Sequence, residues 1–212
     1  MKDIVIIGAG GLGRETAFLI DQINSFSLEW NLLGFIDDSV ESYNTLINGH
    51  YVIGNTDWLA DQECYYVIAI ANPTIKENIY KKLRKTKLQL ATLIHPAVSI
   101  ASTVQIGEGT IITNGNFLTV NIKIGKNVLI DYNCFIGHDA VISDFCTLYP
   151  SVNVSGFCFL SEGVSMGVGS SIIQGLSIGN FSTIGAGATV IDKIPDKCTA
   201  VGTPAKPIKY FE

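Results

Sequence analysis

A histidine followed directly by an aspartate, His138 and Asp139, is the pair of side chains in this sequence best suited to chemistry. The chain has only 3 histidines, and this one lies in IGHDA (residues 136–140), within a stretch otherwise rich in Ile, Gly, Ser and Val. An imidazole can take a proton from an amine or hydroxyl near neutral pH, and a neighbouring carboxylate raises its basicity. The pair therefore predicts a general base. The alternative is a solvated corner residue with no role.

The residues around this pair follow a six-residue repeat. Every sixth residue from Ile100 to Val190 is a large aliphatic residue or Met, and a second row two residues earlier is mostly small or β-branched. A period of six fits neither an amphipathic helix nor a half-buried strand, and it is typical of a hexapeptide β-helix. Three such repeats make one coil of about 18 residues. We therefore expect residues 93–212 to form a β-helix domain.

The repeat also predicts where the histidine lies. His138 comes two residues after the inward-facing Ile136, so its side chain should emerge at or near a corner of the coil. One coil later stands Gly156, whose amide is unencumbered and could donate a hydrogen bond to a developing oxyanion. An exposed corner of an isolated β-helix is a poor catalytic cleft.

Residues 1–92 are predicted to form a small α/β unit. The segment KDIVIIGAGGLGRETAFLI (residues 2–20) reads as a buried strand, a glycine turn and a helix beginning near Gly11. The glycines that satisfy the G-x-G-x-x-G motif are Gly8, Gly10 and Gly13. Backbone N–H groups at such a helix N-terminus favour a phosphate group.

A second predicted strand, WNLLGFIDD (residues 30–38), ends in two aspartates placed to accept hydrogen bonds from a sugar hydroxyl. They are Asp37 and Asp38. The glycine motif alone would suggest an NAD-dependent dehydrogenase, or merely a turn that packs a helix on a strand. The unit is only half of a dinucleotide fold, and a β-helix follows it. A mononucleotide phosphate therefore fits its length better.

Charge and composition exclude several classes of protein. The formal net charge is −5, and the largest basic cluster, residues 81–85, reads as a solvated helix face, so no nucleic acid partner is expected. No apolar run approaches the roughly 18 residues of a membrane span. The N-terminus enters a strand at once, which predicts no signal peptide. We therefore expect a cytoplasmic protein.

The cysteines are predicted to be reduced and structural. There are 5 of them, without CxxC spacing. Three are spaced by twelve residues, Cys134, Cys146 and Cys158, and a coil of about 18 residues would place them on three different faces. They are therefore interpreted as core residues at small positions, and no metal site is expected.

Several motifs together resemble a known family. They are GAGGLGRE (8–15), GFIDD (34–38), AIANPTIK (69–76), IGHDAVISDF (136–145), IGAGATVIDKIP (184–195) and VGTPAK (201–206). With the order of the two domains, they resemble the bacterial sugar acetyltransferases, which include sialic acid O-acetyltransferases (NeuD type) and UDP-4-amino-sugar N-acetyltransferases (PglD type). The resemblance implies a left-handed β-helix, a homotrimer, and acetyl-CoA bound in a groove between neighbouring β-helices.

The resemblance also implies roles for individual residues. The catalytic base falls on His138, its acidic partner on Asp139, and the placement of Gly156 as oxyanion donor is supported. The nucleotide of the sugar substrate is implied to bind at Gly10, Gly11, Leu12, Asp37 and Asp38.

The residues that contact acetyl-CoA in the family are only partly matched in this sequence. Where the amino-sugar enzymes have a second histidine that contacts acetyl-CoA, this chain has Thr147, which can donate one hydrogen bond but carries no charge. Val168 and Ala186 align with positions of the acetyl-CoA groove, where only their backbone atoms are implied to contact the cofactor. Lys206 is either a partner for a CoA phosphate or a solvated lysine.

The predicted activity is acetyl transfer from acetyl-CoA to a nucleotide-linked sugar, with the 4-amino group of a UDP- or dTDP-amino sugar as the preferred acceptor. The product would feed surface glycan synthesis. The attack would be direct, because no nucleophilic Ser or Cys has a triad partner. The alternatives are O-acetylation of sialic acid or another sugar hydroxyl, and a non-catalytic trimeric scaffold that binds a nucleotide sugar.

Overall fold

A computed structural model describes residues 1–211. The chain divides into two compact units, one spanning Met1–Pro96 and the other beginning at Ala97. The boundary predicted from the sequence, between residues 92 and 93, lies just before β7 (Leu93–Ile94) of the first unit. No helix within the described residues is long and apolar enough to cross a membrane.

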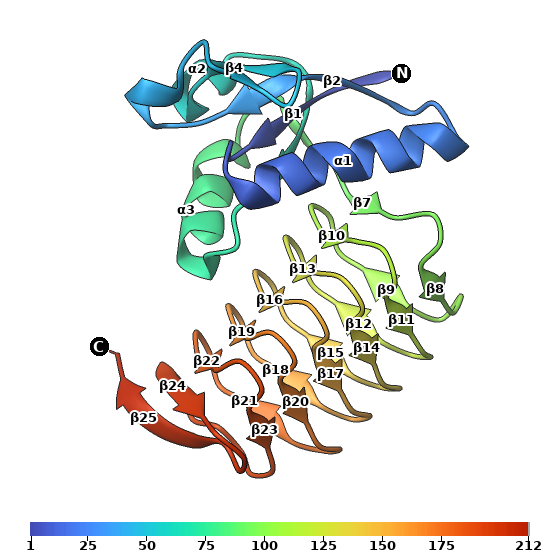
Figure 1. Cartoon of the computed structure of the whole chain (residues 1–212), viewed down its shortest axis with the longest axis vertical. Coiled ribbons are helices and arrows are strands. Elements are labelled where there is room, and N and C mark those ends of the chain that lie inside the picture. Colours follow the sequence, from blue (N-terminus) through green and yellow to red (C-terminus); the bar gives the residue numbers. More distant parts are fainter. Residues whose placement is uncertain (212) are drawn as a thin grey trace. The chain divides into compact units, whose positions relative to one another are not determined.

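The first unit is built on a largely parallel sheet with the strand order β3-β4-β2-β1-β5-β6 (Figure 1). Only the β3–β4 pair is antiparallel. The strands are β1 (Lys2–Ile7), β2 (Trp30–Ile36), β3 (Leu46–Ile47), β4 (His50–Gly54), β5 (Tyr65–Ile68) and β6 (Gln89–Leu90). The helices are α1 (Gly11–Phe26), η1 (Val40–Ser42), α2 (Thr56–Leu59) and α3 (Pro73–Leu83). The carboxyl ends of β1 and β2 are therefore neighbours.

The glycine-rich segment after β1 forms the predicted turn from strand to helix. β1 ends in a run of buried residues, as is typical of a central strand in a parallel sheet. Gly8 has a φ of 103°, and a Cβ at Gly13 would collide with the carbonyl oxygen of Gly8, so both positions require glycine. α1 begins at Gly11, as predicted. The close approach holds the N-terminus of α1 beside the end of β1.

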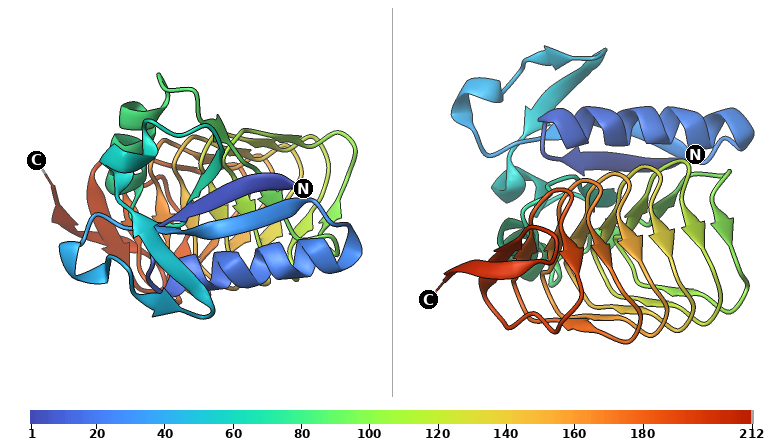
Figure 2. Two further views of the ribbon diagram at one scale, coloured as in Figure 1. Left: turned by 90° about the horizontal axis from the view of Figure 1, so that it is seen from above. Right: turned by 60° about the horizontal axis from the view of Figure 1, so that its bottom comes forward.

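The second unit is a parallel β-helix whose two-residue strands stack in successive coils (Figure 2). The β14 sheet contains β8 (Ser99–Ile100), β11 (Phe117–Leu118), β14 (Phe135–Ile136), β17 (Asn153–Val154), β20 (Ser171–Ile172) and β23 (Thr189–Val190). The β15 sheet contains β9 (Gln105–Ile106), β12 (Lys123–Ile124), β15 (Val141–Ile142), β18 (Phe159–Leu160) and β21 (Ser177–Ile178). The β16 sheet includes β10 (Ile111–Ile112), β13 (Leu129–Ile130), β16 (Thr147–Leu148), β19 (Ser165–Met166), β22 (Thr183–Ile184), β24 (Cys198–Val201) and β25 (Lys206–Tyr210).

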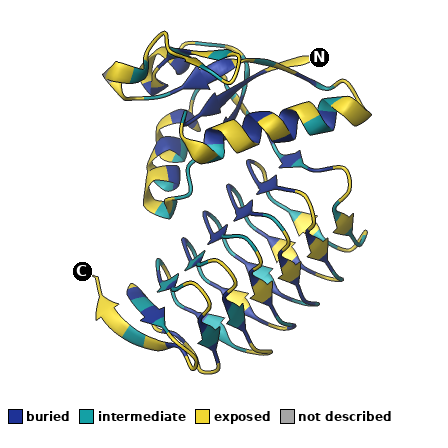
Figure 3. Cartoon of the chain, viewed as in Figure 1, coloured by how far each residue is buried: buried dark blue, intermediate teal, exposed yellow. Residues whose placement is uncertain are grey.

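The six-residue row is buried inside these coils. Figure 3 shows buried and exposed positions along the ribbon of the coils. Each member from Ile112 to Val190 is the second residue of its strand and is at most 5% exposed. Neighbouring coils pair in parallel with a repeat of 18 residues, as between Phe117 and Phe135. The predicted fold class, a half-Rossmann-like α/β domain followed by a left-handed parallel β-helix, is confirmed.

The cysteines of the repeat are buried at three different corners of the coil, as predicted. Their thiols donate hydrogen bonds to main-chain carbonyl oxygens, for example from Cys134 to Asp131 at 3.1 Å and from Cys146 to Ser161 at 3.1 Å. Burial raises the pKa of the Cys134 thiol to about 12, so this thiol remains protonated at neutral pH. These side chains fill the core of the β-helix.

Candidate functional site

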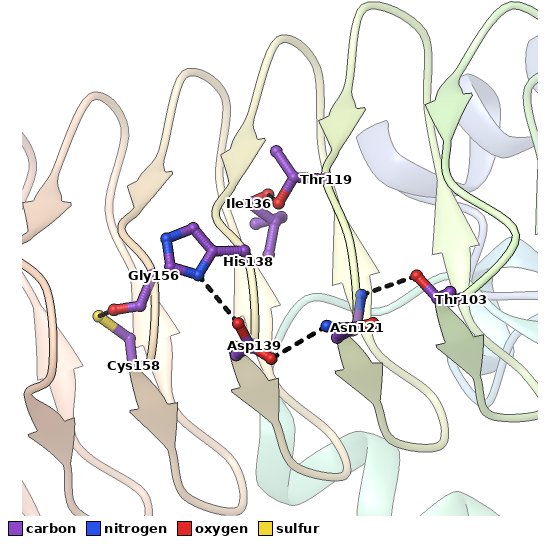
Figure 4. Close-up of polar contacts among 8 residues, drawn as sticks. All are labelled: Thr103, Thr119, Asn121, Ile136, His138, Asp139, Gly156 and Cys158. Carbon is purple, nitrogen blue, oxygen red and sulfur yellow. Dashed lines mark hydrogen bonds and ion pairs between the residues drawn. The ribbon is translucent and has the colours of Figure 1, made fainter.

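The predicted base and its acidic partner lie at the corner that follows β14 (Figure 4). His138 Nδ1 and Asp139 Oδ2 are 2.9 Å apart, and the two side chains are 46% and 34% exposed. The hydrogen bond from His138, followed by that from Asn121, lowers the pKa of the Asp139 carboxyl despite an opposing effect of desolvation. The carboxylate is therefore ionised at neutral pH and can hold a proton on Nδ1, which leaves the Nε2 lone pair for a substrate.

The backbone at this corner allows the two adjacent side chains to meet. Asp139 has a φ of 57°, in the left-handed region that Asp tolerates better than most residues. Its N–H donates a hydrogen bond to the carbonyl oxygen of Val120 at 3.0 Å, one coil earlier. In an extended strand, neighbouring side chains would point to opposite faces. The tight corner is therefore what brings carboxylate and imidazole together.

Gly156 lies against the imidazole ring, as the count of one coil predicts. A Cβ at this position would be 2.6 Å from His138 Nε2. The ring of Phe157 lies edge-on to the imidazole, with centroids 5.0 Å apart. The Gly156 N–H donates no hydrogen bond to any of the residues that the structure describes. Gly156 is buried in the chain, and the role of its N–H as an oxyanion donor stays a prediction.

Replacing Gly156 with alanine is expected to lower turnover by about tenfold or more, because the new methyl group would displace the imidazole and small misplacements of a reacting group are costly. Steady-state kinetics would measure the loss. Thermal unfolding of the same variant provides the control, since a melting temperature like that of the parent would exclude a misfolded coil. Turnover equal to that of the parent would contradict the importance of the ring position.

The N-terminus of α1 presents unpaired N–H groups to solvent. Gly10 is the N-cap residue, and no side chain accepts a capping hydrogen bond from the helix there. Gly11 and Leu12 are the first residues of the helix. The first N–H groups of a helix have no acceptor within it, and the helix dipole favours an anion there. The predicted phosphate-binding residues therefore lie together, and phosphate binding by them stays a prediction.

Asp37 lies next to this turn, but its carboxylate already holds main-chain groups. Asp37 Oδ2 accepts a hydrogen bond from the Ala9 N–H at 3.0 Å, and Oδ1 accepts one from the Ser39 N–H at 2.9 Å. Each carboxylate oxygen retains a second lone pair. Asp37 thus stabilises the turn, and its contact with a sugar hydroxyl stays a prediction.

Asp38 is held in a similar way by the start of α2. Its two oxygens accept hydrogen bonds from the Thr56 N–H at 2.8 Å and from Thr56 Oγ1 at 3.0 Å. Both aspartates line a cavity of about 360 Å³ together with Tyr43 and Trp58. These two aromatic residues could not be predicted from the sequence, because they come from segments after β2 and β4 that carry no recognisable motif.

The cofactor candidates lie away from His138 within one chain. Thr147 is buried on β16, in a different sheet from β14. Val168 and Ala186 are exposed and one coil apart, at the corners that follow β19 and β22. Lys206 Nζ is 3.1 Å from Asp192 Oδ2 in an exposed ion pair. A single chain therefore does not bring these residues together with the histidine, and their contacts with a cofactor stay predictions.

Comparisons with known proteins agree with this architecture. Residues 3–83 match the PglD N-terminal domain. UDP-N-acetylbacillosamine N-acetyltransferase of Bacillus subtilis is 30% identical over 124 residues, which cover 53% of this chain and 51% of that protein. The chain thus matches about half the length of this curated relative.

Two solved structures resemble nearly the whole chain. The acetyltransferase domain of PglB from Neisseria gonorrhoeae, in complex with acetyl coenzyme A, is 27% identical, with a TM-score of 0.89 over 98% of this chain and 99% of that one. PerB from Caulobacter crescentus, in complex with CoA and GDP-perosamine, is 25% identical, with a TM-score of 0.87 over 99% of this chain and 98% of that one.

Fold and site together define a class: a Rossmann-like α/β unit joined to a hexapeptide β-helix with a histidine–aspartate corner. The predicted resemblance to the bacterial sugar acetyltransferases of the NeuD and PglD type is confirmed. More particularly, most of the first unit matches the PglD N-terminal domain, and a second curated relative, GDP-perosamine N-acetyltransferase of Escherichia coli O157:H7, is 29% identical over 124 residues, which cover 57% of this chain and 55% of that protein.

Proposed function

We propose that this chain is an acetyl-CoA-dependent N-acetyltransferase that acts on the amino group of a nucleotide-linked sugar, for use in surface glycan synthesis. The observation that carries the proposal is the hydrogen-bonded His138–Asp139 pair at an accessible corner of the β-helix, with the unpaired N–H of Gly156 beside it. The proposal is supported by the structural relatives, one of which holds CoA together with GDP-perosamine.

The side chains suit a direct transfer. Bound acetyl-CoA would supply the acetyl group as a thioester. Asp139 holds the proton of the imidazole on Nδ1, and His138 Nε2 takes a proton from the sugar amine as its nitrogen bonds to the thioester carbon. The Gly156 N–H stabilises the negative charge that develops on the carbonyl oxygen. The carbon–sulfur bond then breaks, and His138 returns its proton to the leaving sulfur.

The nucleotide would bind to the first unit. Its phosphates would contact the N–H groups at the start of α1, at Gly10, Gly11 and Leu12. Hydroxyl groups of the nucleotide would donate to the free lone pairs of Asp37 and Asp38. The aromatic walls of the neighbouring cavity offer a surface on which a planar base could pack.

Assembly into a homotrimer would complete the active site. The cofactor candidates Val168 and Ala186 lie at a different corner of the coil from His138, so an interface between chains is needed to combine them. Phe117 and Phe135 lie on the β14 sheet next to the His138 corner, exposed and stacked with centroids 6.1 Å apart. Exposed apolar surface of this kind is typical of a subunit interface.

A CoA-release assay tests the proposed activity. We expect free thiol to appear when acetyl-CoA is mixed with a UDP-, dTDP- or GDP-linked 4-amino sugar, and not with the matching 4-hydroxy sugar, because the amine is the attacking group. Release with sialic acid alone would favour O-acetylation instead. Nucleotide-sugar binding without release from any acceptor would contradict the proposal and favour a non-catalytic scaffold.

A further inference from the structure

Polar residues from successive coils form a column that ends at the His138–Asp139 pair. Thr103, Asn121 and Asp139 occupy the same corner of the β-helix, each 18 residues after the last (Figure 4). The Asn121 N–H donates a hydrogen bond to Thr103 Oγ1 at 2.9 Å. The Asn121 side-chain Nδ2 donates another to Asp139 Oδ1 at 3.2 Å. Asp139, the predicted acidic partner of His138, is therefore itself hydrogen-bonded to Asn121.

The two oxygens of the Asp139 carboxylate are held from two sides. Oδ2 faces His138 Nδ1, and Oδ1 faces the amide of Asn121. The carboxylate is partly exposed, so the surrounding protein does not hold it by burial. Without the second donor, the carboxylate could rotate and exchange its contact with the imidazole for contacts with water. The hydrogen bond from the Asn121 amide therefore helps to keep Asp139 Oδ2 in contact with His138 Nδ1.

The backbone presents the Asn121 amide at the required position. Asn121 has a φ of 58°, nearly the same as the 57° of Asp139 one coil later. Asparagine is among the few residues that readily adopt this left-handed conformation. The hydrogen bond to Thr103 fixes the main chain at the same point. Because the two corners have the same backbone geometry, the Asn121 amide lies directly beside the Asp139 carboxylate of the next coil.

We propose that Asn121 is a positioning residue, which orients the Asp139 carboxylate and through it the His138 imidazole for proton transfer. This inference rests on the proposed function, in which His138 accepts the proton of the attacking amine. Asn121 makes no contact with the imidazole itself among its hydrogen bonds in the described residues, so its effect must pass through Asp139.

The variant Asn121→Gly tests the proposal, because glycine keeps the left-handed backbone and removes only the amide. We expect kcat to fall about three- to tenfold, as for the loss of one typical hydrogen bond, while the KM values for both substrates and the melting temperature remain those of the parent. Asn48→Gly is the matched control, since Asn48 has a φ of 47° and is exposed in the turn between β3 and β4 of the first unit. Its kcat should not change.

A double-mutant cycle separates positioning from a general structural effect. In the background Asp139→Gly, which also tolerates the left-handed backbone, Asn121→Gly should cause no further loss of kcat, because the group that it orients is gone. An equal loss in both backgrounds would overturn the proposal, since Asn121 would then act independently of Asp139.

Crystal structures of the parent and of Asn121→Gly give a readout that needs no activity. We expect the Asp139 carboxylate in the variant to turn away from the ring or to occupy several rotamers, with the 2.9 Å contact to His138 Nδ1 lost. An unmoved carboxylate would overturn the positioning role. A parent without acetyl transfer would contradict the proposed function, and the crystallographic comparison would still decide the role of Asn121.

Discussion

Replacing His138 with alanine should lower the turnover of acetyl transfer by about 10²–10⁴-fold, because the variant loses the group that accepts the proton of the amine. Asp139 cannot replace it, because an aspartate carboxylate is a much weaker base than an imidazole, and the hydrogen bond from Asn121, which the variant keeps, lowers the pKa of that carboxyl further. The KM values should change little, because proton transfer stabilises the transition state more than the bound substrates. The CoA-release assay with a saturating amino sugar measures the change.

A second histidine provides the matched control for this experiment. His50 lies on β4 in the first unit, edge-on to Phe35 with ring centroids 6.3 Å apart, and has no place in the proposed chemistry. The variant His50→Gln should retain the turnover of the parent. Parent-like turnover in His138→Ala would show that the base lies elsewhere, and the proposed mechanism would then be wrong.

Replacing Phe135 with aspartate should convert the proposed trimer to monomers and lower turnover by about 100-fold or more. The ring of Phe135 is exposed and stacks on Phe117 beside the His138 corner, so a neighbouring chain would bury it. An aspartate there would place an unpaired charge in the interface, which is strongly unfavourable. Separated chains would also lose the groove that unites His138 with the cofactor candidates, and misplaced reactants react far more slowly.

Sedimentation velocity and the CoA-release assay on the same preparation measure both effects. Phe211→Asp is the control, because Phe211 is 42% exposed, close to the 41% of Phe135, and lies at the end of the second unit near β25. We expect that variant to remain trimeric and active. A parent that sediments as a monomer, or a Phe135→Asp variant that stays trimeric, would contradict an interface at this face.

Much of the architecture could be predicted from the order of residues alone. The six-residue row could be buried only if short strands turned regularly around an axis, and the structure confirms this for Ile112 through Val190. The same period placed Gly156 one coil beyond His138, where a Cβ would meet the ring. The glycine motif likewise predicted the start of α1 at Gly11, because two of its positions admit no side chain.

Contacts that depend on rotamers and on backbone dihedral angles were decided only by the tertiary structure. The amide of Asn121 reaches Asp139 because both corners share the same left-handed φ, and no motif marks that asparagine. Asp37 turns toward the Ala9 N–H, and Thr147 is buried in a different sheet from β14, the strand that precedes His138. Periodicity determines which face of a coil a residue occupies. The hydrogen bonds that its side chain makes depend on neighbours brought together from distant coils and strands.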